Sequence, residues 1–175
     1  MTAQEKIQMS FERVRKALQQ KPSFGWGTGV SRARVSNGLT CTVREGNWEF
    51  VADMPEQAGG NAAGPTPGVY GRAALGSCLA IGYMMRAAAA GVQINALEVE
   101  VQADYDDGAL FGTTKDVPPG YLEIRYTVIV DSDESEELIN QVLDEADMHS
   151  PYLDVFSRAQ TCKRIVRMVS AKQPG

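Results

Sequence analysis

Apolar residues recur at helical spacing near the start of the chain. Charged side chains separate four such positions, which are Ile7, Phe11, Val14 and Leu18. This pattern predicts an amphipathic helix over about residues 1–20. Pro22 and the Gly25-Trp26-Gly27 cluster end it, because proline and glycine disfavour a continuing helix.

Residues 29–53 have the pattern of a β-meander. Asn37-Gly38 lies between Val35 and Leu39 and favours a two-residue hairpin turn of type I′. The segment 45–47 (Glu-Gly-Asn) predicts a second turn before the strand that begins at Trp48.

A helix over about residues 69–90 is predicted after the Gly- and Pro-rich loop 54–68. Most of its residues are small, and it contains Gly71, Gly76 and Gly82. Each glycine inside a helix costs about 1 kcal/mol relative to alanine. Three of them therefore indicate that another element packs very close to the helix backbone. Gly91 ends the helix at the position where glycine is favoured.

The second half predicts two half-buried strands and a mixed architecture. Apolar and polar residues alternate over 97–105 and again over 122–130. Further predicted elements are a helix over 138–146 behind a capping box of Asp133 and Glu136, a break at 149–151, a short helix over 152–160 and a final strand over Lys163–Val169. The order predicts an α+β fold with antiparallel sheet. We expect a single domain over 1–175, with 1–28 as an N-terminal helical extension.

Composition narrows the classes of function. The chain has 175 residues, of which 43% are hydrophobic, and a net charge of −5, so a nucleic-acid partner is not expected. The longest uncharged central run, 73–85, is shorter than the roughly 20 residues that a membrane span needs. The polar start 1–10 has no signal-peptide pattern, which predicts a cytoplasmic protein without membrane contact.

The cysteines favour neither a disulfide framework nor a metal site. Cys41, Cys78 and Cys162 are odd in number and widely spaced, and His149 is the only histidine. We therefore expect no bound metal and no cofactor.

Cys78 is the candidate reactive residue. Its neighbours on the helix face are all apolar, and they are Ala74, Leu75, Ile81, Gly82 and Met85. Such a thiol is either a buried core residue or a nucleophile on the floor of an apolar pocket. A nucleophile needs a nearby cation. Arg72 and Arg86 lie off this face, so we expect Arg32 or Arg34 on the first strand, or Arg44 on the second, to supply it.

The segment GPTPGVYGRAALGSCLAIGY (64–83) resembles the signature of the OsmC/Ohr superfamily, the osmotically induced and organic hydroperoxide resistance proteins. DMPEQAGGNAAGPTP, GVQINALEVEVQADYDD, YLEIRYTVIV and MHSPYLD follow the order of that family, so the resemblance covers about residues 29–169. It implies antiparallel sheets wrapped around two central helices in an intertwined homodimer, with the pocket at the subunit interface.

The resemblance also implies a reaction. In active members the helix cysteine attacks an organic hydroperoxide and becomes a sulfenic acid, which a second cysteine converts to a disulfide. An arginine from the N-terminal strands and a glutamate ahead of the helix polarise the reacting groups. Cys78 matches the attacking cysteine. This chain departs from the pattern at two positions, with Gly68 and Val69 where the glutamate belongs and Ser150-Pro151 in place of a Cys-Pro pair.

Two hypotheses of function follow. In the first, Cys78 with Arg32 or Arg34 reduces an organic hydroperoxide or attacks another hydrophobic electrophile, in a pocket formed by Leu75, Ile81, Gly82, Met85 and Ser150. A small-molecule thiol, Cys41 or Cys162 then resolves the product. In the second, the chain binds a small hydrophobic ligand without catalysis. A structural dimer with no ligand is a third reading. Loop 106–120, which contains Leu110 and Phe111, is either a cover of the pocket mouth or an ordinary surface loop.

Overall fold

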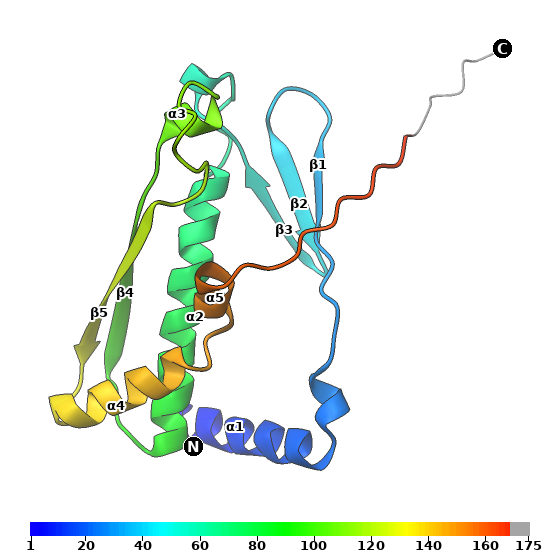
Figure 1. Cartoon of the computed structure of the whole chain (residues 1–175). Coiled ribbons are helices and arrows are strands. Elements are labelled where there is room, and N and C mark those ends of the chain that lie inside the picture. The colour runs from blue at the N-terminus through cyan, green and yellow to red at the C-terminus, as the bar shows by residue number, and fades with distance from the viewer. Residues whose placement is uncertain (169–175) are drawn as a thin grey trace.

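A computed structural model describes residues 1–168 and shows helices packed with two antiparallel sheets (Figure 1). The predicted α+β class is confirmed. The helices are α1 (Ala3–Gln20), α2 (Pro67–Ala90), α3 (Asp107–Leu110), α4 (Glu136–Asp147) and α5 (Pro151–Ser157). The strands are β1 (Arg32–Val35), β2 (Cys41–Glu45), β3 (Trp48–Ala52), β4 (Ala96–Asp104) and β5 (Glu123–Asp131).

The first sheet has the order β1-β2-β3, as the meander pattern predicts. The turn between β1 and β2 differs from the prediction. A type I′ turn needs a positive φ at both central residues, and of Asn37 and Gly38 only the glycine has one, at 66°. The loop instead spans 36–40, and Val35 pairs with Cys41.

The long central helix α2 carries the core. On one face, Leu75, Leu79 and Tyr83 are buried against the inward side chains of β4 and β5, among them Val101 and Ile124. A Cβ built on Gly76 would lie 3.2 Å from Cγ2 of Val101. The close approach expected from the glycines is thus present at Gly76, where the sheet lies almost directly on the helix backbone.

The C-terminal helices cover another side of α2. Ile139 and Val142 of α4 are buried with Ala87 at the end of α2. The helix is capped by Ser135, whose hydroxyl accepts a hydrogen bond from the Leu138 amide at 3.3 Å, so the predicted capping box from Asp133 is wrong. Helix α4 therefore has its N-cap at Ser135, two residues after the predicted Asp133. Ser135 can cap the helix because its hydroxyl lies within reach of the Leu138 amide, which has no partner inside the helix.

Two predicted segments end differently in the structure. The short helix α5 stops at Ser157 instead of residue 160. The final strand is wrong over residues 163–168, which form no strand, and Val169 lies outside the described residues. These residues are exposed and have no strand beside them to complete a hydrogen-bonded ladder within this chain.

The helix α1 packs against α2 near its C-terminal end. The side-chain amide of Gln4 donates to the Val92 carbonyl at 3.0 Å, and the Arg86 guanidinium lies 5.2 Å from the centre of the Phe11 ring. Helix α2 itself is long and apolar enough to cross a membrane by length and composition alone, a property that core helices of water-soluble proteins share.

The loop before α2 is organised by a buried carboxylate. Asp53 is 2% exposed and accepts hydrogen bonds from the Thr40 hydroxyl at 2.8 Å and from the amides of Met54, Asn61 and Ala63. Burial by itself raises the pKa of Asp53, but these four donors outweigh it and hold the pKa below the usual 3.8.

This arrangement predicts a pH-dependent stability difference. Because the folded-state pKa of Asp53 is lowered, its contribution to stability is complete above the unfolded-state value and is lost as the pH falls through the folded-state value. Asp53→Asn should therefore be less stable than the wild type at pH 7, with a gap that narrows on acidification below about pH 4. Urea unfolding at several pH values measures this gap, and a gap independent of pH would contradict the assignment.

Candidate functional site

Cys78 lies in the fourth turn of α2 and its side chain is half-buried. Its sulfur lies 3.7 Å from the hydroxyl oxygen of Ser150, within the range of a hydrogen bond to sulfur. The structure thus brings together two of the residues that the sequence selected, although 72 positions separate them along the chain.

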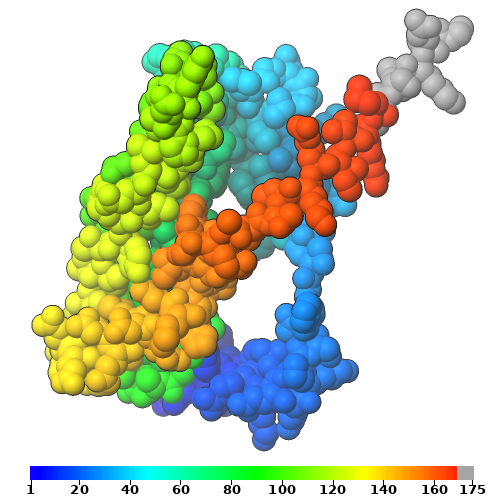
Figure 2. Space-filling view, in the orientation of Figure 1, coloured from blue at the N-terminus to red at the C-terminus, as the bar shows by residue number. Residues whose placement is uncertain are grey.

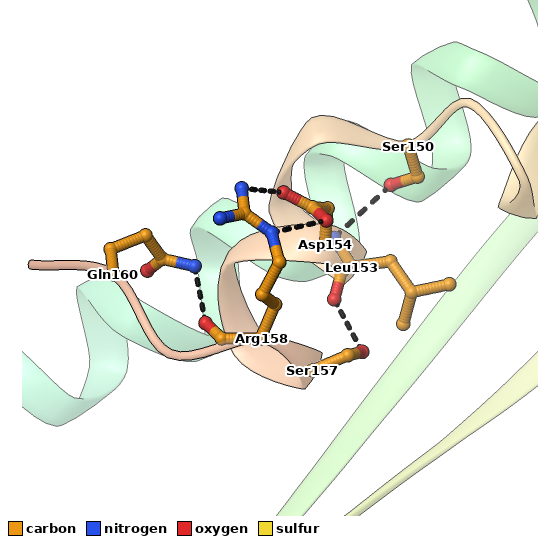
Figure 3. A network of polar contacts seen from close by, with 6 residues as sticks. All are labelled: Ser150, Leu153, Asp154, Ser157, Arg158 and Gln160. Atoms are coloured by element: carbon orange, nitrogen blue, oxygen red, sulfur yellow. Dashed lines mark hydrogen bonds and ion pairs between the residues drawn. The ribbon is translucent and has the colours of Figure 1, made fainter.

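Ser150 is held in place by the start of α5. It is 8% exposed, and its hydroxyl oxygen accepts a hydrogen bond from the Leu153 amide at 3.3 Å (Figure 3). A serine hydroxyl has one proton and two lone pairs, so accepting from Leu153 leaves the proton available to the sulfur of Cys78. Pro151, at the first position of α5, fixes the chain direction there. Ser150 can therefore donate a hydrogen bond to the thiol and cannot form a disulfide with it.

A polar cluster centred on Asp147, three residues before Ser150, fixes the end of α4. The Tyr83 hydroxyl donates to one oxygen of the Asp147 carboxylate at 2.7 Å, and the Tyr126 hydroxyl donates to the other at 2.8 Å. Burial raises the pKa of Tyr126, and the hydrogen bond to Asp147 adds to this effect, so that the pKa reaches about 12. The same two causes raise the pKa of Tyr83 by a larger amount. The cluster ties α2, β5 and α4 together. Sequence reasoning missed it, because no local pattern links residues so distant in the chain.

The predicted arginines lie elsewhere in this chain. Arg32 and Arg34 are exposed on β1, the edge strand of the first sheet. Among residues 1–168 no hydrogen bond joins Cys78 to an arginine, and its only side-chain partner is Ser150. The principal packing partners of α2 are β4, α4, α1 and α5. Arg32, Arg34 and Cys78 are thus not brought together within the single chain.

The residues predicted to line a pocket around Cys78 are divided between the core and the surface. Leu75 is 1% exposed and packs under β4 and β5, whereas Ile81 is 61% and Met85 41% exposed. A Cβ built on Gly82 would meet no atom within 4 Å. Of the predicted pocket residues, Ser150 is the one within hydrogen-bonding distance of the sulfur, and the exposed side chains of Ile81 and Met85 do not form a buried wall in the single chain.

A cavity of about 1020 Å³ lies instead at the N-terminal end of α2. Its walls include the first turn of α2 and Arg72, the loop that carries Leu110 and Phe111, and Phe156 of α5, and residues 39 and 54–58 also contribute to them. Cys78 is not among its lining residues. The sequence offered one signal for this cavity, which is the pair of large apolar residues in loop 106–120.

Within residues 1–168 no group of three or more histidine, cysteine, aspartate or glutamate side chains is placed to hold a metal ion.

Comparison with models of known protein families shows which family the chain belongs to. The model of the OsmC-like protein family matches residues 59–163, which include Cys78, Ser150 and most of the cavity wall. The chain therefore belongs to the OsmC-like protein family. A comparison with curated protein sequences gives no match.

Solved structures agree with this fold. An OsmC-like protein from Mycoplasma pneumoniae has a TM-score of 0.65 at 19% identity, covering 75% of this chain and 88% of that one. An osmotic stress induced and detoxification response protein, described as putative, from Psychrobacter arcticus has a TM-score of 0.59 at 15% identity, covering 75% and 90%. An organic hydroperoxide resistance protein from Elizabethkingia anophelis has 0.57 at 16%, covering 74% and 88%.

The distance between Cys78 and Ser150 predicts an engineered disulfide. Ser150→Cys should form a disulfide with Cys78 on mild oxidation, because the two side-chain atoms already lie 3.7 Å apart. Intact mass and peptide mapping, with Cys41 and Cys162 replaced by serine, measure the bond. Ser157→Cys, at the far end of α5, is the matched control and should stay reduced. Equal oxidation of both variants would contradict the geometry.

Proposed function

We propose that this OsmC-like protein is a single-thiol enzyme that uses Cys78 to reduce an organic hydroperoxide, or to react with another hydrophobic electrophile. The observation that supports it most directly is the half-buried thiol facing the Ser150 hydroxyl, in a helix that the family model includes. A structural neighbour from Legionella pneumophila is described as an organic hydroperoxide resistance protein, which agrees with this choice of substrate.

In the proposed reaction, a small-molecule thiol supplies the two electrons that reduce the hydroperoxide. The Cys78 sulfur attacks the terminal oxygen of the hydroperoxide, an S–O bond forms and the O–O bond breaks. The leaving alkoxide takes a proton and departs as the alcohol, and Cys78 becomes a sulfenic acid. A thiol then displaces water to give a mixed disulfide, and a second thiol releases Cys78 and leaves as the disulfide.

An external thiol is the proposed reductant because the described residues contain no disulfide to Cys78 and its hydrogen-bond partner is a serine. Cys41 lies on β2, paired with Val35 and Ala52, and Cys162 is exposed in the segment after α5. All three cysteines are free, and Ser150 stands opposite the reactive sulfur.

The alternative is a non-catalytic binder of a small hydrophobic molecule. The absence of a guanidinium beside Cys78 in the described part of the chain favours it, because a thiolate nucleophile is normally stabilised by a cation. The two functions differ in whether Cys78 changes chemically.

Trapping the oxidised sulfur separates the two. With cumene hydroperoxide and dimedone, the wild type should gain one dimedone adduct on Cys78, and the double variant Cys41→Ser/Cys162→Ser should behave in the same way. Cys78→Ala should gain none and should lose at least ten-fold in thiol-dependent hydroperoxide turnover. Intact mass and a coupled thiol-oxidation assay measure both. An unmodified wild-type thiol would contradict the enzymatic proposal and favour the binder.

We further propose that the working unit is a homodimer of one OsmC-like domain per chain, with residues 1–28 as a helical extension, in the cytoplasm. The support is a row of five exposed uncharged residues spaced four apart on α2, namely Val69, Ala73, Ser77, Ile81 and Met85. Figure 2 also shows an opening through the molecule, bounded by α1, the segment that leads to β1, and the C-terminal segment. Both features suit a second chain.

Association through this row predicts a selective effect of charge. The wild type should elute at about twice the 19.0 kDa of one chain, and Ile81→Glu should shift it towards the monomer. Because the Ile81 side chain is already exposed in the single chain, the substitution should leave the fold of each chain unaffected. Size-exclusion chromatography with light scattering measures the mass. Met148→Glu, at the exposed apolar residue that follows α4, is the control, and a dimeric Ile81→Glu would contradict the interface.

A further inference from the structure

The cavity at the N-terminal end of α2 combines a large apolar wall with one cation. Tyr121 and Phe156 form part of the wall, with ring centres 6.1 Å apart, and Ile124 continues it. Leu110 and Phe111 at its edge are both exposed. A volume of about 1020 Å³ is at the upper end of the range for small-molecule sites. Exposed apolar side chains around a hollow of this size favour an apolar ligand.

Arg72 is the only Lys or Arg among the residues that line this cavity. Its side chain is half-buried, and among residues 1–168 it takes part in none of the ion pairs. Withdrawing a guanidinium from water without a partner is unfavourable. Arg86, on the same helix, is instead paired with Glu145. The contrast marks Arg72 as a cation placed to receive an anion from outside the chain.

The acidic residues at the cavity do not neutralise Arg72. Asp106 accepts a hydrogen bond from the Gly108 amide at 2.7 Å, which caps α3, and Asp107 is exposed to solvent. The Tyr121 hydroxyl is also engaged, because it donates to the Gly68 carbonyl at 2.8 Å. Arg72 is therefore the group that determines the charge of a ligand bound against the aromatic wall.

We propose that this cavity binds an amphipathic carboxylate, with its carboxylate on Arg72 and its hydrocarbon part along Tyr121, Phe156 and Phe111. The planar guanidinium suits a carboxylate because it can donate two parallel hydrogen bonds. The site is separate from Cys78, so binding does not depend on the thiol chemistry proposed above.

The test uses decanoate as the probe, with 1-decanol as its uncharged counterpart, below their aggregation limits. Isothermal titration calorimetry on the wild type should give one decanoate per chain, and 1-decanol should bind at least ten-fold more weakly, because it cannot form charge-assisted hydrogen bonds with the guanidinium. Arg72→Gln should weaken decanoate at least ten-fold and leave 1-decanol unchanged. Arg86→Gln is the matched control and should bind decanoate like the wild type.

A second pair of variants tests whether a carboxylate of the protein itself can occupy Arg72 in place of the ligand. A Cβ on Gly68 would lie 3.6 Å from Nη1 of Arg72, an ordinary contact, so this position tolerates a side chain. Gly68→Glu should place a carboxylate on Arg72 and abolish decanoate binding, whereas Gly68→Ala should keep it. Circular dichroism verifies that each variant is folded.

The outcomes separate this proposal from the enzymatic one. Cys78→Ala should bind decanoate like the wild type, so a loss of turnover leaves this site intact. Equal decanoate affinity in the wild type and Arg72→Gln, preference for 1-decanol, or no binding to the folded wild type would each overturn the carboxylate site.

Discussion

The close contact between α2 and the β4–β5 sheet at Gly76 is the constraint on which the other features depend. A Cβ at this position would approach Val101 to 3.2 Å and the Val99 carbonyl oxygen to 3.7 Å, so a side chain here would push the sheet outward. The same sheet carries Tyr126, which reaches Asp147, and Ile124, which lines the cavity. Gly71 has a similar role one turn earlier, since the Tyr121 hydroxyl lies 3.2 Å from its built Cβ. The cost of glycine in a helix is thus offset by contacts that place both candidate sites.

The polar cluster of Tyr83, Asp147 and Tyr126 links this packing to the position of the Ser150 hydroxyl. Two hydroxyl donors satisfy a carboxylate that would otherwise be poorly solvated between α2, β5 and α4. The chain then needs only three residues to pass from Asp147 to Ser150, which starts α5 and faces Cys78. The separation of sulfur and hydroxyl is therefore fixed by a polar contact within the fold, in addition to hydrophobic packing.

The sequence predicts most of the fold and only part of the site. Alternation over 97–105 and 122–130 locates β4 and β5 within one or two residues at each end, because a half-buried strand repeats every two residues. The glycines of α2 and its end at Gly91, with φ of 73°, are equally local signals. The predicted final strand is wrong over residues 163–168, because strand formation needs a partner edge, which the local pattern does not report. The cavity was missed for a related reason, since its walls come from six separate segments of the chain.

The position of Cys78 on α2 explains why the single chain leaves its chemistry incomplete. Successive residues of a helix are rotated by about 100°, so Cys78 lies beside the exposed row that includes Ser77 and Ile81 and borders the face covered by α5. Ser150 lies on the α5 side of the sulfur, and Cys78 itself is half-buried. No guanidinium among residues 1–168 makes a hydrogen bond to the sulfur, while Arg32 and Arg34 stand free on an edge strand. Under the proposed thiol chemistry, the exposed row is the side from which a cation of a second chain would reach Cys78.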